Sequence, residues 1–562
     1  MALSGTTTPP TQEDPSEKEV ETREQQLPTS PSEKSKDDLK EAPADGIPDE
    51  EGGTWVTGLS LFTILGAICL VCFLMLLDTS IIVTAVPQIT TKFHSLQDVG
   101  WYGSAYQLSS ATLLPLTGKL YMNFDSKWTF LCFFGIFELG SLLCGVATSS
   151  NMLIVGRAVA GIGTSGIQNG AFTIIAECVP MTKRPALIGM VMGVSQLGLV
   201  VGPLIGGALT QYTTWRWCFY INLPIGGLVA VTLCFVTIPR QTAKPKALSV
   251  FRALHRKLDL IGFAIFAPAA IQLLLALEYG GNQYAWNSST VIGLFCGAVA
   301  TALLWIVWDY HKGDNALIPL PMLRKRIVWS SCLVYGFLMS QMFTTSYYLP
   351  IYFQGVKGVT PTLSGVYLLP MILAQLFSAI GSGILVGKLG YYLPVSLFGA
   401  MLIAIGNGLV STFDPGSSEG KWIGYQILLG AGSGSALQMP MIAVQNTLQP
   451  VQIPVAMALL MFSQTFGGAL FLSFSDTIFT NSLKALIPTY APSVDATTVI
   501  NAGANGFRRL ISGSDLVNVL VAYAKSVNRV FYLTASAGVC CFIFTWGMGW
   551  KDIREKKEVS KA

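Results

Sequence analysis

The stretch GLVVGPLIGGALTQYTTWRWCFYINLPIGG, residues 198–227, does most to decide the fold of this chain. Gly198, Gly202 and Gly206 recur every four residues, so on a helix they form one stripe of glycines. Such a stripe lets the backbone of a neighbouring helix approach closely, and Pro203 beside it is expected to bend the helix. The stretch therefore predicts a tightly packed helix followed by a short aromatic loop and a second helix.

The composition is that of a membrane protein. Hydrophobic residues make up 51% of the 562 residues, charged residues only 12%, and the mean hydropathy is +0.54. Runs of about 20 mainly apolar residues, enough to cross about 30 Å of hydrocarbon, recur along the chain. We predict an all-α polytopic membrane protein with fourteen transmembrane helices, at residues 58–84, 99–120, 128–147, 152–176, 186–209, 218–238, 260–278, 290–309, 327–350, 363–386, 391–412, 422–446, 454–477 and 529–549. Without the seventh and eighth spans, twelve helices would remain.

The distribution of Lys and Arg predicts that both termini are cytoplasmic. In that orientation most basic residues fall in cytoplasmic loops, including the clusters at 252–257 and 324–326. The short external loops then hold only Lys92, Arg216, Lys357 and Lys421. The sequon Asn287-Ser288-Ser289 falls outside, so Asn287 is a candidate glycosylation site.

The chain divides into five parts by composition and span order. Residues 1–57 hold fourteen acidic and five basic residues and many Ser, Thr and Pro, which predicts a disordered acidic cytoplasmic tail. We expect an N-terminal six-helix half at 58–238, followed by a linker with two inserted transmembrane helices at 239–326. A C-terminal six-helix half follows at 327–550, with a long extracellular loop at 479–528, and the chain ends in a basic cytoplasmic tail at 551–562. The eleven Cys lie in or beside spans, so neither disulfides nor a metal site is expected.

An internal repeat supports the two halves. Gly118-Lys119-Leu120 recurs as Gly387-Lys388-Leu389, an offset of 269 residues. The same offset relates further glycines, namely Gly161 to Gly430, Gly163 to Gly432 and Gly198 to Gly467. Two repeated six-helix halves around a central cavity form the transporter plan in which rocking exposes a midplane site to each side in turn. The alternative is a chance match in a glycine-rich chain.

Ionisable residues inside the spans are the candidates for proton coupling, because each costs about 2.5–3.5 kcal/mol to insert. Asp78, Glu138 and Arg157 are the deepest, and the residues 269 positions later are neutral. Asp78 lies late in the first span and Arg157 early in the antiparallel fourth, so the two could meet. Burial favours the neutral carboxyl and a guanidinium favours the ionised one, so such a contact could control proton binding. The alternative is a static buried ion pair.

Several linked motifs resemble one family. The pattern G-x-x-x-G-P-x-x-G-G from Gly198 through Gly207, with W-R-W-x-F-x-I-N-x-P-x-G after it, resembles the fifth-helix antiporter motif and following loop of the major facilitator superfamily, in its fourteen-helix drug:proton antiporter branch. Leu77-Asp78-Thr79-Ser80 resembles the first-helix motif of that branch, and the segment from Gly156-Arg157 to Gly163 its fourth-helix motif. The resemblance implies alternating access and proton antiport, with the proton gradient as the energy source and no cofactor.

The loop after the second span departs from the family pattern. Met122 and Asp125 stand where the family has an Asp and a Gly, which puts the usual cytoplasmic latch in doubt. Gly118 and Lys127 remain, and Glu177 with Lys183 and Arg184 could supply substitute charge pairing, or these could be ordinary solvated loop charges.

The substrate cavity is expected to be apolar and aromatic. Its possible polar handles are Tyr347, Tyr348, Gln354, Gln426, Gln438 and Gln445, although the glutamines could equally hydrogen-bond between helices. Such a cavity suits neutral or weakly charged amphipathic molecules. Similar members with the acidic tail and the Leu-Asp-Thr-Ser opening are typical of filamentous fungi, where they export secondary metabolites, toxins or antifungal drugs.

Other functions are less well supported. A phosphate-binding G-x-x-x-x-G-K-[ST] motif is not present, because Leu120, Leu389 and Trp422 follow the three Gly-Lys pairs. His94-x-x-x-Asp98 and His255-x-x-x-Asp259 match an acyl-transfer pattern but fall on opposite sides of the predicted membrane. We expect a non-enzymatic, monomeric efflux antiporter of the plasma membrane, or of a vacuolar or vesicular membrane, with no nucleic-acid partner. Proton-coupled uptake of a nutrient or iron chelate is the alternative.

Overall fold

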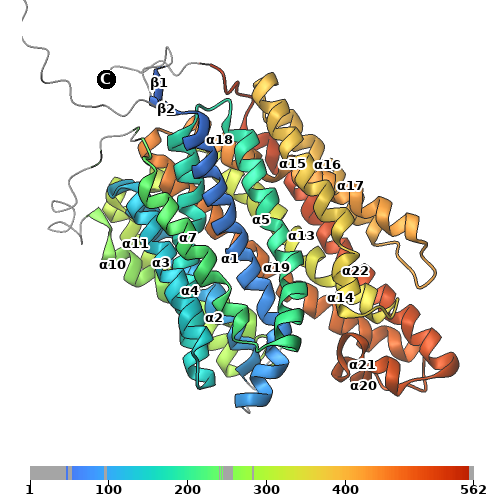
Figure 1. Ribbon diagram of the computed structural model, residues 1–562. Helices are drawn as coiled ribbons and strands as arrows, with labels where there is room; N and C mark the ends of the chain where they lie inside the picture. Colours follow the sequence, from blue (N-terminus) through green and yellow to red (C-terminus); the bar gives the residue numbers. More distant parts are fainter. Residues whose placement is uncertain are drawn as a thin grey trace, which may run out of the picture. The chain divides into compact units, whose positions relative to one another are not determined.

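The computed structural model describes residues 46–48, 54–93, 98–239, 241, 244, 257–281 and 284–555. Residues 45–562 form one compact unit, in which the long helices run side by side (Figure 1). The helices are α1 (Gly58–Phe93), α2 (Val99–Asn123), α3 (Ser126–Gly145), α4 (Ser150–Cys178), α5 (Arg184–Tyr212), α6 (Trp217–Tyr220), α7 (Asn222–Phe235), α10 (Leu260–Tyr279), α11 (Ser289–Lys312), α12 (Leu320–Leu323), α13 (Arg326–Gly355), α14 (Pro361–Val366), α15 (Leu369–Leu389), α16 (Leu393–Val410), α17 (Glu419–Leu437), α18 (Met439–Thr447), α19 (Ile453–Tyr490), α20 (Ala496–Asn501), α21 (Gly503–Leu510) and α22 (Gly513–Thr545).

Twelve helical segments of the described residues are long and apolar enough to cross a membrane. They include α10 and α11, the inserted pair whose spans were the least secure prediction. Helices α2 and α4 occupy the second and fourth predicted spans but are not among the twelve. Both are rich in Gly, Ser and Thr, and the buried face of α4 carries Arg157 and Asn169, which lowers its mean hydropathy. The count of fourteen spans therefore stays a prediction.

The segment 479–528, expected to be an extracellular loop, is mostly helical. Helix α19 continues to Tyr490, α20 and α21 follow, and α22 begins at Gly513. Aromatic side chains from α19, α21 and α22 pack against one another here, so the segment folds into helices. The ring centroid of Tyr523 lies 5.2 Å from that of Phe479 and 5.0 Å from that of Phe507.

The predicted terminal tails are partly structured. Strands β1 (Gly46–Pro48) and β2 (Thr54–Val56) pair antiparallel, and Val56 is buried. Ile47 pairs with Trp55 in this sheet, and Trp55 and Val56 are large apolar residues just before α1, which explains why this part of the expected tail packs. At the other end, the Ile553 amide donates to the Gly390 carbonyl oxygen over 2.9 Å. The rest of the predicted tails, at 1–45, 49–53 and 556–562, and the basic residues Arg252 and Arg256 lie outside the described residues.

The repeated glycines make equivalent contacts in the two parts of the chain. A Cβ atom on Gly118 of α2 would lie 2.8 Å from Val455 Cα of α19, and one on Gly387 of α15 would lie 2.6 Å from the carbonyl oxygen of Thr182, just before α5. Gly198 faces α1 as Gly467 faces α13. The other two pairs follow the same rule, with Gly161 against α2 and Gly430 against α15, and Gly163 against α3 and Gly432 against α16. Equivalent packing at a constant offset argues against a chance match.

Candidate functional site

The structure brings Asp78 of α1 and Arg157 of α4 together as a buried ion pair. Arg157 Nη1 lies 2.5 Å from Asp78 Oδ2, and the side chains are 1% and 0% exposed. Arg157 Nε donates to the backbone carbonyl oxygen of Tyr102 over 2.9 Å, and its Cζ lies 4.3 Å from the Tyr106 ring centroid. The guanidinium is thus fixed by a carboxylate, a carbonyl and an aromatic face.

Asn222, the first residue of α7, completes this site, and the sequence analysis did not select it. Its Nδ2 donates to Asp78 Oδ1 over 3.2 Å and to Ser141 Oγ of α3 over 3.1 Å. Both Asn222 and Ser141 are fully buried. The I-N-L-P motif places this polar residue among apolar ones at a helix start, which is the signal that could have identified it.

Glu138 lies near this site but does not join the ion pair. Its side chain is partly buried between α3 and α7, and a Cβ atom on Gly226 would collide with Glu138 Oε1. Neither carboxylate oxygen of Glu138 has a hydrogen-bond partner among the described residues. Glu138 lies one turn before Ser141 on α3, so it is close to the ion pair without contacting it.

The glycine stripe of α5 packs against α1, the helix that carries Asp78. A Cβ atom on Gly198 would lie 2.6 Å from the Phe73 carbonyl oxygen and 2.8 Å from the Leu77 amide nitrogen. Gly202 and Gly206 face the next turns of α1, and Ser80 Oγ donates to the Gly198 carbonyl oxygen over 3.0 Å. The stripe therefore fixes the backbone position of Asp78. Gly207, in contrast, has no atom within 4 Å of a Cβ position.

The other close contacts of α5 are made with α15, at the predicted cytoplasmic end. A Cβ atom on Gly189 would lie 2.5 Å from the Ala379 carbonyl oxygen, and one on Gly383 would lie 2.6 Å from Ala186 Cα. Gly118 makes the matching contact between α2 and α19. The predicted halves therefore meet at glycines that leave no room for a side chain.

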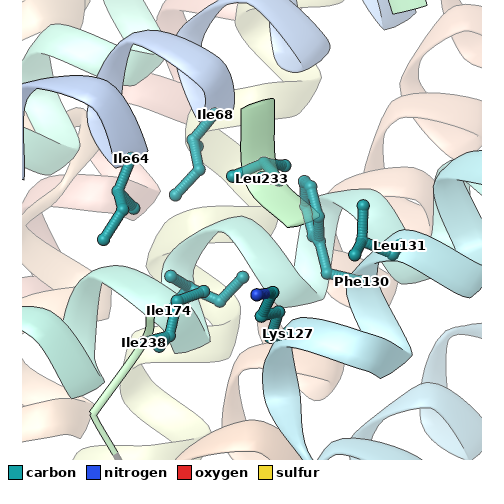
Figure 2. A pocket seen from close by; sticks show the side chains of 8 residues that line it. All are labelled: Ile64, Ile68, Lys127, Phe130, Leu131, Ile174, Leu233 and Ile238. Atoms are coloured by element: carbon teal, nitrogen blue, oxygen red, sulfur yellow. The ribbon is translucent and has the colours of Figure 1, made fainter. Parts of the chain in front are cut away.

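Lys127, expected at the cytoplasmic gate, fastens the end of α7. Its Nζ donates to the backbone carbonyl oxygens of Cys234 and Val236 over 2.8 and 2.7 Å. Figure 2 shows this side chain among apolar side chains from α1, α3, α4 and α7, including Ile64, Ile68, Phe130, Ile174 and Leu233. Asp125 caps the start of α3, where it accepts from the Lys127 and Trp128 amides.

Glu177 pairs with a linker residue, Lys244, which the sequence analysis had not selected. Lys244 Nζ lies 3.0 Å from Glu177 Oε1, and the Ser126 hydroxyl donates to the same oxygen over 2.8 Å. Arg184, the other basic residue suggested for this surface, donates to the Ala176 and Val179 carbonyl oxygens at the end of α4. Glu177, Arg184 and Lys244 border a cavity of about 270 Å³, which is also lined by Trp55, Tyr121 and Pro454.

The expected substrate handles do not form one group. Tyr347 is 60% exposed, whereas Tyr348 is buried with its ring centroid 5.6 Å from that of Phe479. Gln354 Nε2 donates to Ser364 Oγ over 2.9 Å.

The buried glutamines differ in their partners. Gln438 donates to the Ala379 carbonyl oxygen and to Ser382 of α15, and Gln445 accepts from Arg184 over 3.5 Å. Both therefore connect helices. Gln426 is fully buried, and neither its oxygen nor its nitrogen has a hydrogen-bond partner among the described residues. Of these glutamines, Gln426 alone keeps both polar atoms available.

The sequon lies at an accessible turn. Asn287 is exposed between α10 and α11, and Ser288 caps α11 by accepting from the Val291 amide. His94 and His255 of the two His-x-x-x-Asp matches lie outside the described residues.

A membrane domain of packed helices with many apolar spans, a buried ion pair and repeated glycines at the helix contacts defines a multi-pass membrane transporter. The sequence profile of the Major Facilitator Superfamily matches residues 68–472, and the chain belongs to this family. It is therefore a transporter of small molecules within a lipid bilayer and not an enzyme.

Named relatives and solved structures agree with this assignment. The chain is 64% identical over 512 residues to the MFS-type transporter pigP of Monascus ruber, covering 91% of this chain and 89% of that protein. It is 50% identical over 539 residues to the efflux pump mlcE of Penicillium citrinum, covering 94% and 96%. The fold resembles that of the proton:xylose symporter XylE, with a TM-score of 0.58 at 15% identity, covering 88% of this chain and 97% of that structure.

Proposed function

We propose that the chain is a proton-coupled exporter of amphipathic small molecules, with fourteen spans in two six-helix halves and an inserted pair. The observation that carries this proposal is the buried Asp78–Arg157 ion pair. Charged side chains inside a membrane are costly to insert, so they usually mark a functional site. Protonation of Asp78 from the outer side would weaken its attraction to Arg157, and release of that proton to the cytoplasm would restore it. Glu138 is the second carboxylate of this proposed pathway.

The contacts between the proposed halves support alternating access. At the predicted cytoplasmic end, α5 meets α15 and α2 meets α19 through glycines. We propose that these contacts close the cytoplasmic side and separate when the cavity opens inward. The linker pair Glu177–Lys244 fastens the same end and takes the place of the family's usual latch. In this orientation both termini are cytoplasmic, and Asn287 faces outward for glycosylation.

Export is favoured over uptake by the names of the relatives. The protein of Penicillium citrinum is named an efflux pump, and so is mokI of Monascus pilosus, which is 50% identical over 502 residues. We propose the same direction here, for a secondary metabolite, toxin or antifungal drug, by a monomer in the plasma membrane. Gln426 and Tyr347 are the polar groups proposed to contact the substrate.

A dye-efflux assay tests this function. The chain is expressed in a yeast strain that lacks its own drug pumps, and the cells are loaded with neutral Nile red or cationic rhodamine 6G. We expect faster loss of at least one dye at acidic than at neutral external pH, and no loss after a protonophore collapses the gradient. Accumulation of dye instead of loss would support the alternative, proton-coupled uptake, and efflux unaffected by the protonophore would overturn proton coupling.

A further inference from the structure

Asp78 accepts a hydrogen bond on each of its two carboxylate oxygens, and only one of the two donors is charged. Arg157 approaches Oδ2 and the Asn222 amide approaches Oδ1. Arg157 has further partners in Tyr102 and the Tyr106 ring, so it can hold its position whichever protonation state Asp78 adopts. Asn222 is therefore the partner of Asp78 whose own hydrogen bonding can change.

The amide of Asn222 can serve both forms of Asp78. Its Nδ2 donates to Asp78 and Ser141, while its Oδ1 has no hydrogen-bond partner among the described residues. A half-turn of the amide exchanges the two atoms, so that Oδ1 can accept from a protonated Asp78. Ser141 can follow this change, because a hydroxyl group donates as readily as it accepts.

We propose that Asn222 is a positioning residue for Asp78, donating to its ionised carboxylate and accepting from its protonated form, with Ser141 as the partner on α3. The inference rests on the proposed proton coupling. The proton comes from the outer solution and binds Asp78 Oδ1; the hydrogen bonds of Asn222 are exchanged, and no covalent bond of Asn222 forms or breaks. Through these contacts a change in the protonation of Asp78 on α1 alters the hydrogen bonds of Asn222 on α7 and Ser141 on α3.

Among the described residues, the ionisable groups around Asp78 are Arg157 on α4, Glu138 and Cys144 on α3, Tyr106 on α2 and Cys218 on α6. Helices α5 and α7 also pack on α1, but their sequences carry ionisable side chains only near their ends, at Arg184, Tyr212 and Cys234. A change at Asn222 therefore acts on Asp78 without altering another charge.

Infrared difference spectroscopy of the purified full-length protein in liposomes tests the proposal without any substrate. The carboxylic-acid stretching band that Asp78→Asn removes is titrated against pH. Asn222→Leu keeps a similar volume and removes both the donor to the ionised carboxylate and the acceptor from the protonated form. Because a hydrogen bond to a charged group is the stronger of the two, we expect the midpoint to rise by about one pH unit. Ser141→Ala, a milder change, is expected to raise it by less. The wild-type band should be accompanied by a shift of an asparagine amide band that Asn222→Leu abolishes.

Asn407→Leu is the matched control. Asn407 of α16 is an equally buried asparagine. It donates a hydrogen bond to Gln341 and accepts from Thr345 and Thr534, with no carboxylate among these partners. Its loss should leave the Asp78 midpoint unchanged. An unchanged midpoint in both Asn222→Leu and Ser141→Ala, or no titrating Asp78 band in the wild type, would overturn the inference. Failure of dye export would contradict the proposed function alone, because the titration needs no transport.

Discussion

At the residue scale, the site is a carboxylate held by groups from several helices. Asp78 on α1 contacts Arg157 from α4 and Asn222 from α7. A buried pair of this kind is destabilised by loss of one partner, because the other charge is left without compensation. Here the Tyr102 carbonyl and the Tyr106 ring still hold Arg157, so the consequences of changing Asp78 fall mainly on proton binding.

We predict that Asp78→Asn abolishes uphill dye efflux while expression and membrane delivery stay near those of the wild type. The amide keeps the shape of the carboxylate and a carbonyl oxygen for Arg157, but it cannot take up a proton. Efflux against a gradient in the pump-deficient yeast is the measurement, with fluorescence microscopy of a tagged protein as the control for delivery. Wild-type efflux from the mutant would remove Asp78 from the coupling mechanism.

Arg157→Lys should also lower efflux by about tenfold or more, since a lost hydrogen bond to a charged group is worth about 1.5–3 kcal/mol. One ammonium group cannot at once reach Asp78, the Tyr102 carbonyl and the face of Tyr106 as the guanidinium does. Arg157→Ala should be more severe. The initial rate of dye loss at equal protein level decides the matter, and a wild-type rate for the lysine variant would mean that Arg157 acts only as a charge.

At the scale of elements, α5 has two packing faces with different partners. Its Gly198–Gly206 stripe contacts α1, which lies in the same predicted half, whereas Gly189 faces α15 of the other half. The glycine stripe thus packs within one predicted half in this structure. Its direct effect is to let α1 lie close enough for Asp78 to reach Arg157.

Gly202→Leu is expected to block transport by displacing α1. A side chain here would collide with Ser80, and overpacking of a close helix contact costs about 1–3 kcal/mol or more. The matched control is Gly207→Leu, because no atom lies within 4 Å of that Cβ position. Thermal unfolding in detergent and dye efflux measure the two consequences. Equal Tm values and equal efflux for both variants would contradict this role of the stripe.

At the scale of the whole molecule, transport requires the predicted halves to separate and meet again at the cytoplasmic end. The glycines of α15 that touch α5 allow the helices to meet closely, as Gly118 of α2 does against α19. A larger side chain at these positions should favour the conformation in which the halves are apart at the cytoplasmic end. The fold of each half should be retained, because each helix keeps its other contacts within its own half.

Gly383→Val should therefore hold the cytoplasmic side open. The new side chain would meet the Ala186 backbone, and helix α15 would be forced away from α5. We expect efflux to be lost while Nile red still binds the detergent-solubilised variant within a few-fold of wild-type affinity. Gly381→Val, on the same helix, is the control, since a Cβ atom at Gly381 would have no neighbouring atom within 4 Å. Loss of dye binding in Gly383→Val alone would show instead that this contact shapes the pocket.

The sequence by itself determined the membrane class and the family, and it placed Asp78 and Arg157 at the same depth in two spans, where they could meet. Hydropathy, helix direction and linked motifs are local properties that can be read along a chain. The tertiary structure decided which partners those residues acquire. Asn222 reaches Asp78, Lys244 reaches Glu177, and the glycine stripe meets α1 only through the packing register of helices distant in sequence. It also extended helices through the segment at 479–528, where burial of aromatic side chains overrides polar composition.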